Sequence, residues 1–132
     1  MLLTMDDIVA GLPRSLYGAF LQGLSIDYVA RRATFELRVC VGNPEAYSQT
    51  EREAYRPATL SVWGLLWCVV EPPEAVDGDT TKGLWIDAGS MSDLGRKPAL
   101  PAVPEGVFVW WIFVRQWNAF IYIAGQTASI ES

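Results

Sequence analysis

The sequence predicts a mostly antiparallel β fold, either a β-sandwich or one strongly curved sheet, with one short helix near the N-terminus. Residues 24–30 and 33–41 alternate between apolar and polar side chains, which is the period of strands that bury one face. Two runs rich in Val, Ile, Phe, Tyr and Trp, residues 107–114 and 119–124, each have the length of one strand. No connection has the helical crossover that a parallel sheet needs. We therefore expect hairpins to dominate, within a single domain over residues 1–132.

The N-terminal part is predicted to form a helix and then a hairpin. Residues 5–10 follow Thr4, which can cap a helix start, and Gly11 with Pro13 ends the helix early. The strands over residues 24–30 and 33–41 are expected to pair through a turn near Arg31 and Arg32, two residues that we interpret as solvated.

The middle of the chain alternates between loops and strands. Residues 45–56 are polar and end at Pro57, so a loop or a short surface helix is expected there. Residues 58–70 predict a long strand bent at Gly64. Residues 71–81 contain two prolines and an Asp-Gly pair, which indicate a loop. A short strand over residues 83–88 and a proline-rich spacer over residues 89–106 lead to the last hairpin.

Residues 107–125 form the most apolar stretch, and they are predicted to be a hairpin at the centre of the sheet, buried largely on both faces. Their length would also fit a membrane helix. Arg115 and its polar neighbours would then lie near the bilayer centre, where a charged side chain is costly. The β-branched and aromatic content favours the hairpin, and residues 126–130 are expected to extend its last strand.

Composition excludes several kinds of chemistry. The chain is 51% hydrophobic, which excludes a disordered chain, and its formal net charge of −5 argues against nucleic acid as a partner. It has no histidine, so it contains no Ser-His or Cys-His nucleophile pair. Cys40 and Cys68 belong to no CxxC pair and are interpreted as buried free thiols. Asp6 and Asp7 stand where a signal peptide carries positive charge, so a cytoplasmic location is expected.

Catalysis and cofactors are not expected. Carboxylates alone would have to supply acid–base chemistry, and no pair is marked for it. Asp77 and Asp79 loosely resemble part of a calcium loop, but the glutamate at its twelfth position is missing, so neither a metal nor another cofactor is predicted.

Three surfaces are candidates for binding. The first is aromatic, because the chain has six tryptophans. Core packing is the alternative role for them, and adjacent Trp110 and Trp111 would point to opposite faces of a strand. The second is the acidic loop over residues 71–79, with further acidic side chains at Glu45, Glu51 and Glu53. The third is the turn of the closing hairpin, residues 115–118, for which packing is the alternative role. The candidate residues are Trp63, Trp67, Trp85 and Trp117, then Arg115 and Asn118, then Glu71, Glu74, Asp77 and Asp79.

A family resemblance adds a possible role. Residues 16–39, LYGAFLQGLSIDYVARRATFELRV, run from a short helix into a β-hairpin, and the chain closes with WNAFIYIAGQTASIE. This layout resembles small β-rich bacterial proteins that include the immunity proteins of polymorphic toxin systems. Where that pattern often has a His-Asp pair before the first strand, this chain has Tyr17-Gly18. The resemblance implies a cytoplasmic protein that binds and neutralises a cognate toxin without catalysis.

The sequence therefore supports a non-catalytic protein-binding module as the leading hypothesis, with an immunity-type inhibitor as its narrower form. An acidic chain would associate fastest with a basic protein partner. The alternative is a small-molecule-binding β domain with a tryptophan-lined pocket. Self-association through the sheet is a third hypothesis.

Overall fold

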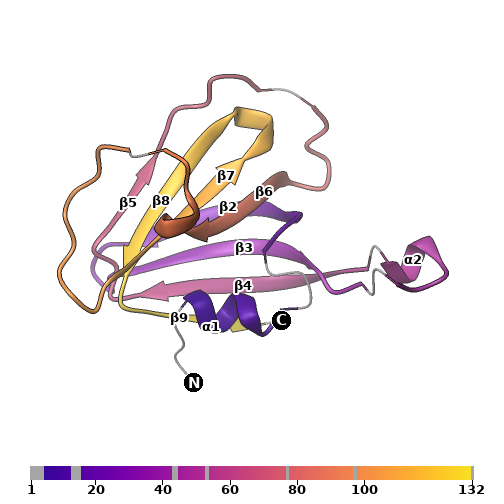
Figure 1. Ribbon diagram of the computed structural model, residues 1–132, viewed down its shortest axis with the longest axis horizontal. Coiled ribbons are helices and arrows are strands. Elements are labelled where there is room, and N and C mark those ends of the chain that lie inside the picture. The colour runs from indigo at the N-terminus through magenta and orange to yellow at the C-terminus, as the bar shows by residue number, and fades with distance from the viewer. Residues whose placement is uncertain are drawn as a thin grey trace.

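The computed structural model describes residues 5–12, 16–42, 45–52, 54–76, 78–96 and 98–131. Strands predominate in it (Figure 1). In chain order the elements are α1 (Met5–Ala10), β2 (Ala19–Asp27), β3 (Arg32–Cys40), α2 (Gln49–Arg52), β4 (Tyr55–Trp63), β5 (Trp67–Val70), β6 (Leu84–Ser90), η1 (Met91–Asp93), β7 (Phe108–Val114), η2 (Arg115–Trp117), β8 (Ala119–Gly125) and β9 (Thr127–Glu131). The mostly antiparallel β class and the short helix at residues 5–10 are confirmed.

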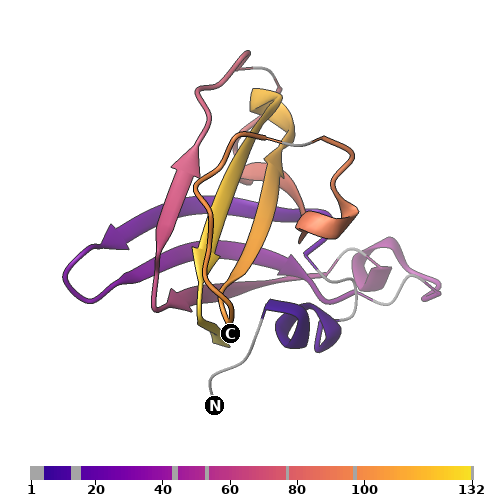
Figure 2. The ribbon, with the colours of Figure 1, turned by 60° about the vertical axis from the view of Figure 1, so that its left-hand side comes forward.

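The strands form one sheet in the order β5-β8-β7-β6-β2-β3-β4-β9, and each neighbouring pair is antiparallel. The sheet is strongly curved, so that β2 and β3 run across the direction of β5, β7 and β8 (Figure 2). Of the two expected forms, the structure adopts the single curved sheet. Its edge strands, β5 and β9, do not pair with each other, so the sheet is not closed.

Two bends bring the edges of the sheet together. β4 continues into β5 past Gly64, whose φ of +63° suits glycine, and β8 continues into β9 past Gly125. The predicted bend at Gly64 is therefore confirmed, but the single strand expected over residues 58–70 is two strands, β4 and β5, which pair with different neighbours. The N–H of Gln126 donates to the carbonyl oxygen of Trp63 over 3.0 Å, and the N–H of Leu66 donates to that of Ala124 over 2.8 Å. These bonds join the two bent strands at one corner of the molecule.

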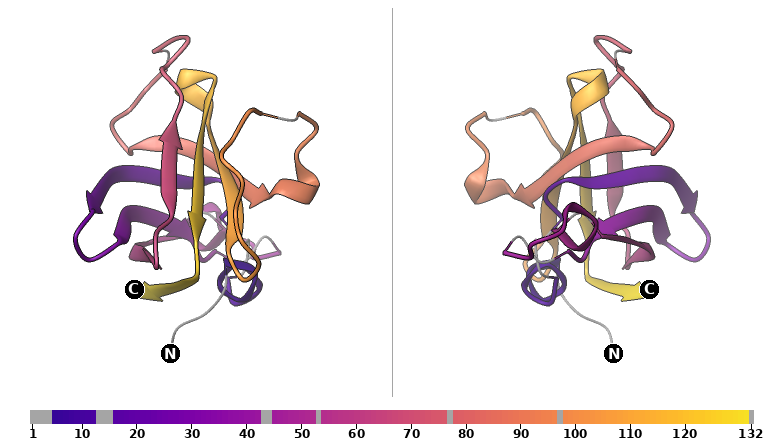
Figure 3. Two further views of the ribbon diagram at one scale, coloured as in Figure 1. Left: turned by 90° about the vertical axis from the view of Figure 1, so that its left-hand side faces the viewer. Right: turned by 90° about the vertical axis from the view of Figure 1, so that its right-hand side faces the viewer.

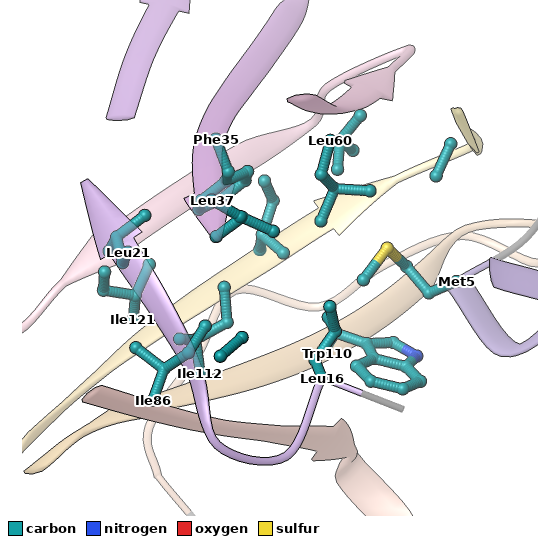
Figure 4. Close-up of a cluster of buried hydrophobic side chains, with 14 of the residues drawn as sticks. Met5, Leu16, Leu21, Phe35, Leu37, Leu60, Ile86, Trp110, Ile112 and Ile121 are labelled. Carbon is teal, nitrogen blue, oxygen red and sulfur yellow. The ribbon is translucent and has the colours of Figure 1, made fainter. Parts of the chain in front are cut away.

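The core fills the concave side of the sheet (Figure 4). Side chains from α1, from the sheet and from Leu16 meet there, and Trp110 lies among them with 4% of its surface exposed. α1 lies along β9 and buries Met5 and Ile8 (Figure 3). Trp110 therefore packs in the core, whereas the adjacent Trp111 is only half-buried, in keeping with the expectation that the two point to opposite faces of the strand.

The first hairpin differs in extent from the prediction. β2 begins earlier, at Ala19, and ends at Asp27, so Tyr28 and Ala30 belong to the turn and not to the strand. The cause is local: the Ala30 N–H donates to Oδ1 of Asp27 over 2.9 Å, and Arg31 takes a left-handed φ of 54°. Tyr28 is consequently exposed instead of facing the core.

The middle strands also begin and turn differently from the prediction. Residues 45–56 contain the short helix α2, but β4 already begins at Tyr55, and Pro57 lies inside it opposite Arg38. Beyond the Gly64 bend the alternation is reset, so that Leu65 is buried and Leu66 is exposed. A single strand over residues 58–70, as predicted, would have continued the alternation past Gly64.

The closing hairpin is confirmed as β7, η2 and β8, in the interior of the sheet. Most of β8 is buried, whereas β7 alternates between buried and half-buried side chains. No helix in the described part of the chain is long and apolar enough to cross a membrane.

Candidate functional site

The turn of the closing hairpin and the acidic loop, predicted as two separate surfaces, lie together in the structure. The loop arches over the end of the hairpin, at the top of Figure 1. The carbonyl oxygen of Trp117 accepts hydrogen bonds from the N–H groups of Glu74 and Ala75, at 2.9 and 3.3 Å. The Asn118 carboxamide donates to Oε2 of Glu74 over 2.6 Å. The loop is therefore fastened to the turn.

The other described carboxylates of the loop also have partners within the molecule. Glu71 accepts the N–H of Phe120 over 2.8 Å and pairs with Arg96 over 3.0 Å. Asp79 accepts the N–H of Thr81 over 2.9 Å, and hydrogen bonds from Thr81 hold the pKa of its carboxyl below the usual value. Asp77 and Glu53 lie outside the described residues. These contacts give the acidic side chains a structural task in addition to their charge.

Four side chains form a row across the outer face of the sheet, which we call the cation–aromatic row: Arg115, Trp85, Phe20 and Arg38. Phe20 lies opposite Trp85 in the β2–β6 ladder and opposite Arg38 in the β2–β3 ladder. The guanidinium carbon of Arg115 lies 4.2 Å from the ring centroid of Trp85. Nε and Nη2 of Arg115 both donate to Oδ2 of Asp87, at 3.1 and 2.9 Å. The arginine is thus held in place over the exposed indole.

Two tyrosines extend the aromatic surface of the row. Tyr17, 53% exposed, lies 6.0 Å from the Arg115 guanidinium carbon, and Tyr55 packs against Phe20 with 5.3 Å between ring centroids. The Tyr55 hydroxyl donates to the carbonyl oxygen of Gly18 over 3.2 Å. Two shallow hollows, of about 470 and 230 Å³, open beside Phe20 and share Lys82 in their walls. The face therefore combines aromatic rings, cations and surface relief.

Trp117 lies on the other side of the turn and lines a cavity of about 590 Å³. Among its described wall residues the apolar ones are Leu21, Leu24, Val70, Leu84, Trp117 and Ile121, and the others are Gln22, Gly23, Thr80, Thr81 and Gly83. Arg115 and Gln116 are not among the described wall residues of this cavity, and both line the larger outer hollow. The turn thus separates an outer contact face from an inner cavity.

Trp63 and Trp67 belong neither to the cation–aromatic row nor to the described wall of the cavity beside Trp117. The Trp63 indole N–H donates to the Ser129 hydroxyl over 3.0 Å, and the Arg32 guanidinium lies 5.1 Å from its ring. Trp67 begins β5 and is half-buried at the corner of the sheet. Of the predicted residues, the structure therefore brings together Trp85 and Arg115 on the outer face, and Trp117, Asn118, Glu71, Glu74 and Asp79 at the turn and loop.

Sequence reasoning did not select Tyr17, Phe20, Arg38, Tyr55 and Lys82. Phe20 was missed because the alternation was traced only from residue 24, past the irregularity between Leu21 and Gly23 in the β2–β3 register. Arg38 was placed correctly on a polar strand face, but only the strand register shows that it lies beside Phe20.

The described residues contain no group of three or more His, Cys, Asp or Glu side chains arranged to hold a metal ion. Cys40 and Cys68 form no disulfide, and burial raises the pKa of the Cys68 thiol to about 11. A thiol with so high a pKa is a poor nucleophile at neutral pH.

No protein-family model matches the sequence, no curated protein matches it, and no solved structure matches the fold.

Proposed function

We propose that this protein is a non-catalytic protein-binding module whose contact face is the cation–aromatic row. The observation that carries the proposal is the exposed Trp85, with Arg115 fixed over it by Asp87. Trp, Tyr and Arg are the side chains most enriched at the energetic centres of protein interfaces. Here Trp85, Tyr17 and Arg115 meet at a single place, and all three side chains remain exposed.

The pre-arrangement of Arg115 supports binding over a role in stability. An exposed ion pair contributes little to folding, about 0–1 kcal/mol, because solvent screens it. A guanidinium already held against a ring loses less side-chain freedom when a partner docks, and this lowers the cost of association. Trp85 itself is 40% exposed, so its free edge is available to a partner.

The charge of the chain supports a basic partner. At a net charge of −5 it attracts a positively charged protein over several ångströms at low salt, whereas Arg115, Arg38 and Lys82 offer local partners for carboxylates at contact. An inhibitor of a toxin that acts on nucleic acid fits the net charge of the chain, because such a toxin has a basic cleft. The cations of the row would then contact carboxylates beside that cleft, since like charges would repel at the cleft itself. An immunity-type protein is the narrower form of the proposal, and the cytoplasm is the compartment in which it would act.

The test is quantitative affinity capture from cells that express the protein, with the wild type, Trp85→Ala and Tyr47→Ala as baits. Tyr47 is fully exposed and lies beside α2, away from the row, so it is a control for the loss of an exposed ring. We expect one partner protein in stoichiometric amount with the wild type and with Tyr47→Ala. We expect Trp85→Ala to bind the purified partner at least about 30-fold more weakly, which corresponds to a loss of about 2 kcal/mol.

Two outcomes would contradict the proposal. One is a partner that binds Trp85→Ala as tightly as the wild type, since the contact face would then lie elsewhere. The other is the absence of any stoichiometric protein partner under conditions in which the bait is folded and expressed.

A further inference from the structure

The cavity beside Trp117 exists because the sheet is interrupted there. β2 pairs with β6 only through Ala19, Phe20 and Leu21, and β6 begins at Leu84. Past the irregularity at Leu21 and Gly23, β2 continues with β3 as its remaining ladder partner. On the far side, the edge strand β5 ends at Val70. The space between these ends is the cavity, and the core residues Leu21 and Ile121 are among those that line it.

The rim of the cavity is held by hydrogen bonds within the molecule. The loop that carries Thr80 and Thr81 is fastened to the hairpin turn through Glu74, and Gln116 reaches the carbonyl oxygens of Asp79 and Gly83 at 3.4 and 3.5 Å. A Cβ on Gly83 would lie 2.8 Å from the Leu21 carbonyl oxygen, so glycine permits the close approach of the loop to β2. A preformed cavity lowers the entropic cost of binding.

The chemistry of the wall indicates the class of ligand. Leucine, valine, isoleucine and tryptophan side chains make up its apolar part, and Gln22, Thr80 and Thr81 provide neutral hydrogen-bonding groups. No ionisable side chain is among the wall residues that the structure describes. A charged ligand would lose its hydration without gaining a counter-ion there, whereas an uncharged one would not. The volume of about 590 Å³ is within the range of cavities that hold small organic molecules.

We propose that this cavity binds a neutral, mostly apolar small molecule, with Gln22, Thr80 and Thr81 contacting its polar groups. The site is distinct from the cation–aromatic row, and either proposal can hold without the other. Trp117 in the wall provides a reporter, because a bound fluorophore accepts excitation energy from a nearby indole.

The experiment uses N-phenyl-1-naphthylamine, a neutral apolar fluorophore, with the protein of residues 1–132. We expect saturable binding with about one site and energy transfer from tryptophan. Trp117→Phe is expected to reduce the energy transfer while leaving most of the binding. Leu24→Trp, which fills the cavity, is expected to weaken binding at least tenfold. Val29→Trp adds the same ring at a fully exposed position of the β2–β3 turn and is expected to bind as the wild type does.

Thr81→Trp is the second filling variant, because Thr81 is exposed at the rim and its substitution does not disturb the core. Circular dichroism checks that each variant is folded. The proposal is overturned if the wild type shows no saturable binding, or if folded Leu24→Trp or Thr81→Trp binds the fluorophore as tightly as Val29→Trp. Equal binding of the anionic analogue 1-anilinonaphthalene-8-sulfonate would also contradict the preference for a neutral ligand.

Discussion

The Asn118 carboxamide donates a 2.6 Å hydrogen bond to Glu74, and this contact joins the closing hairpin to the acidic loop. Asn118 also takes a left-handed backbone conformation, with φ 47° and ψ 46°, at the end of η2. Asparagine tolerates this region better than most residues with a Cβ. One residue therefore both closes the hairpin and anchors the loop beside the cavity.

Replacing Asn118 separates these two tasks. Asn118→Gly removes the hydrogen bond but suits the backbone, so we expect a loss of about 0.5–1.5 kcal/mol in the free energy of unfolding. Asn118→Ala removes the bond and also strains the backbone, which adds about 1–2 kcal/mol. Urea denaturation followed by tryptophan fluorescence measures both. If the alanine variant is as stable as the glycine variant, the left-handed conformation is not maintained in solution.

The corner where the sheet bends is the second place to test. A Cβ on Gly125 would overlap the side chain of Val62 and approach the Trp63 carbonyl oxygen to 3.3 Å. We expect Gly125→Ala to cost about 1–3 kcal/mol, because the corner has no room for a methyl group. Gly23→Ala is the matched control, since a Cβ there meets no atom within 4 Å. Thermal unfolding compares the two, and an equal effect would argue against a tightly packed corner.

The sequence predicted where the strands lie in the chain better than it predicted which strands pair in the sheet. Alternation identified β3, and β-branched and aromatic content identified the closing hairpin. The helix signals at Thr4 and Gly11 placed α1 correctly, because all these features depend on local chemistry. The order of the strands was beyond reach, since it depends on contacts between residues far apart in the chain. The bend at Gly64 was visible, but its effect on Leu65 and Leu66 required the structure.

The candidate surfaces were predicted only in part, because residue types can be read from the sequence but contacts between distant residues cannot. Trp85 and Arg115 were selected separately from their residue types, and their stacking follows from the pairing of β6 with β7. The link between Glu74 and Asn118 joins residues 44 positions apart, and no local pattern signals it. The cavity depends on where two strands stop pairing, which composition does not encode.

Cys68 provides a prediction about pH. Burial raises the pKa of its thiol to about 11 from an ordinary value near 9, so the thiol stays protonated in the folded chain where it would ionise in the unfolded chain. Between pH 9 and 11 the unfolded state therefore binds fewer protons, and stability falls as the pH rises, by at most about 1.4 kcal/mol per pH unit. Urea denaturation of the wild type and Cys68→Ala over this range measures the difference. If the free energy of unfolding falls with pH no more steeply in the wild type than in Cys68→Ala, the raised pKa of Cys68 is contradicted.

The same protonation slows the reaction of Cys68 with alkylating reagents. In a Cys40→Ala background only Cys68 can react. At pH 8 its thiolate fraction is about two orders of magnitude below that of a free cysteine, and higher intrinsic nucleophilicity offsets only part of this. We expect iodoacetamide to modify the folded protein at least about tenfold more slowly than the urea-unfolded protein, as followed by mass spectrometry. Equal rates would show that the thiol is accessible and ionised.

Asp87 provides the final prediction, because it orients Arg115 without belonging to the cation–aromatic row. Asp87→Asn removes the charge that holds both guanidinium nitrogens, and the pair is partly exposed, so we expect a stability loss of no more than about 1 kcal/mol. Released from Asp87, Arg115 is expected to leave the Trp85 ring for part of the time, which lowers the affinity for the protein partner about three- to tenfold, mainly through faster dissociation. Stopped-flow or surface-based kinetics with the purified partner measures this effect.

Thr59→Ala is the control. It removes the hydrogen-bond partner of another outer-face carboxylate, Glu36, away from Trp85, and we expect it to leave the dissociation rate unchanged. If Asp87→Asn binds as tightly as the wild type, holding the Arg115 guanidinium over Trp85 has no part in recognition, and the contact would rest on the other side chains of the row.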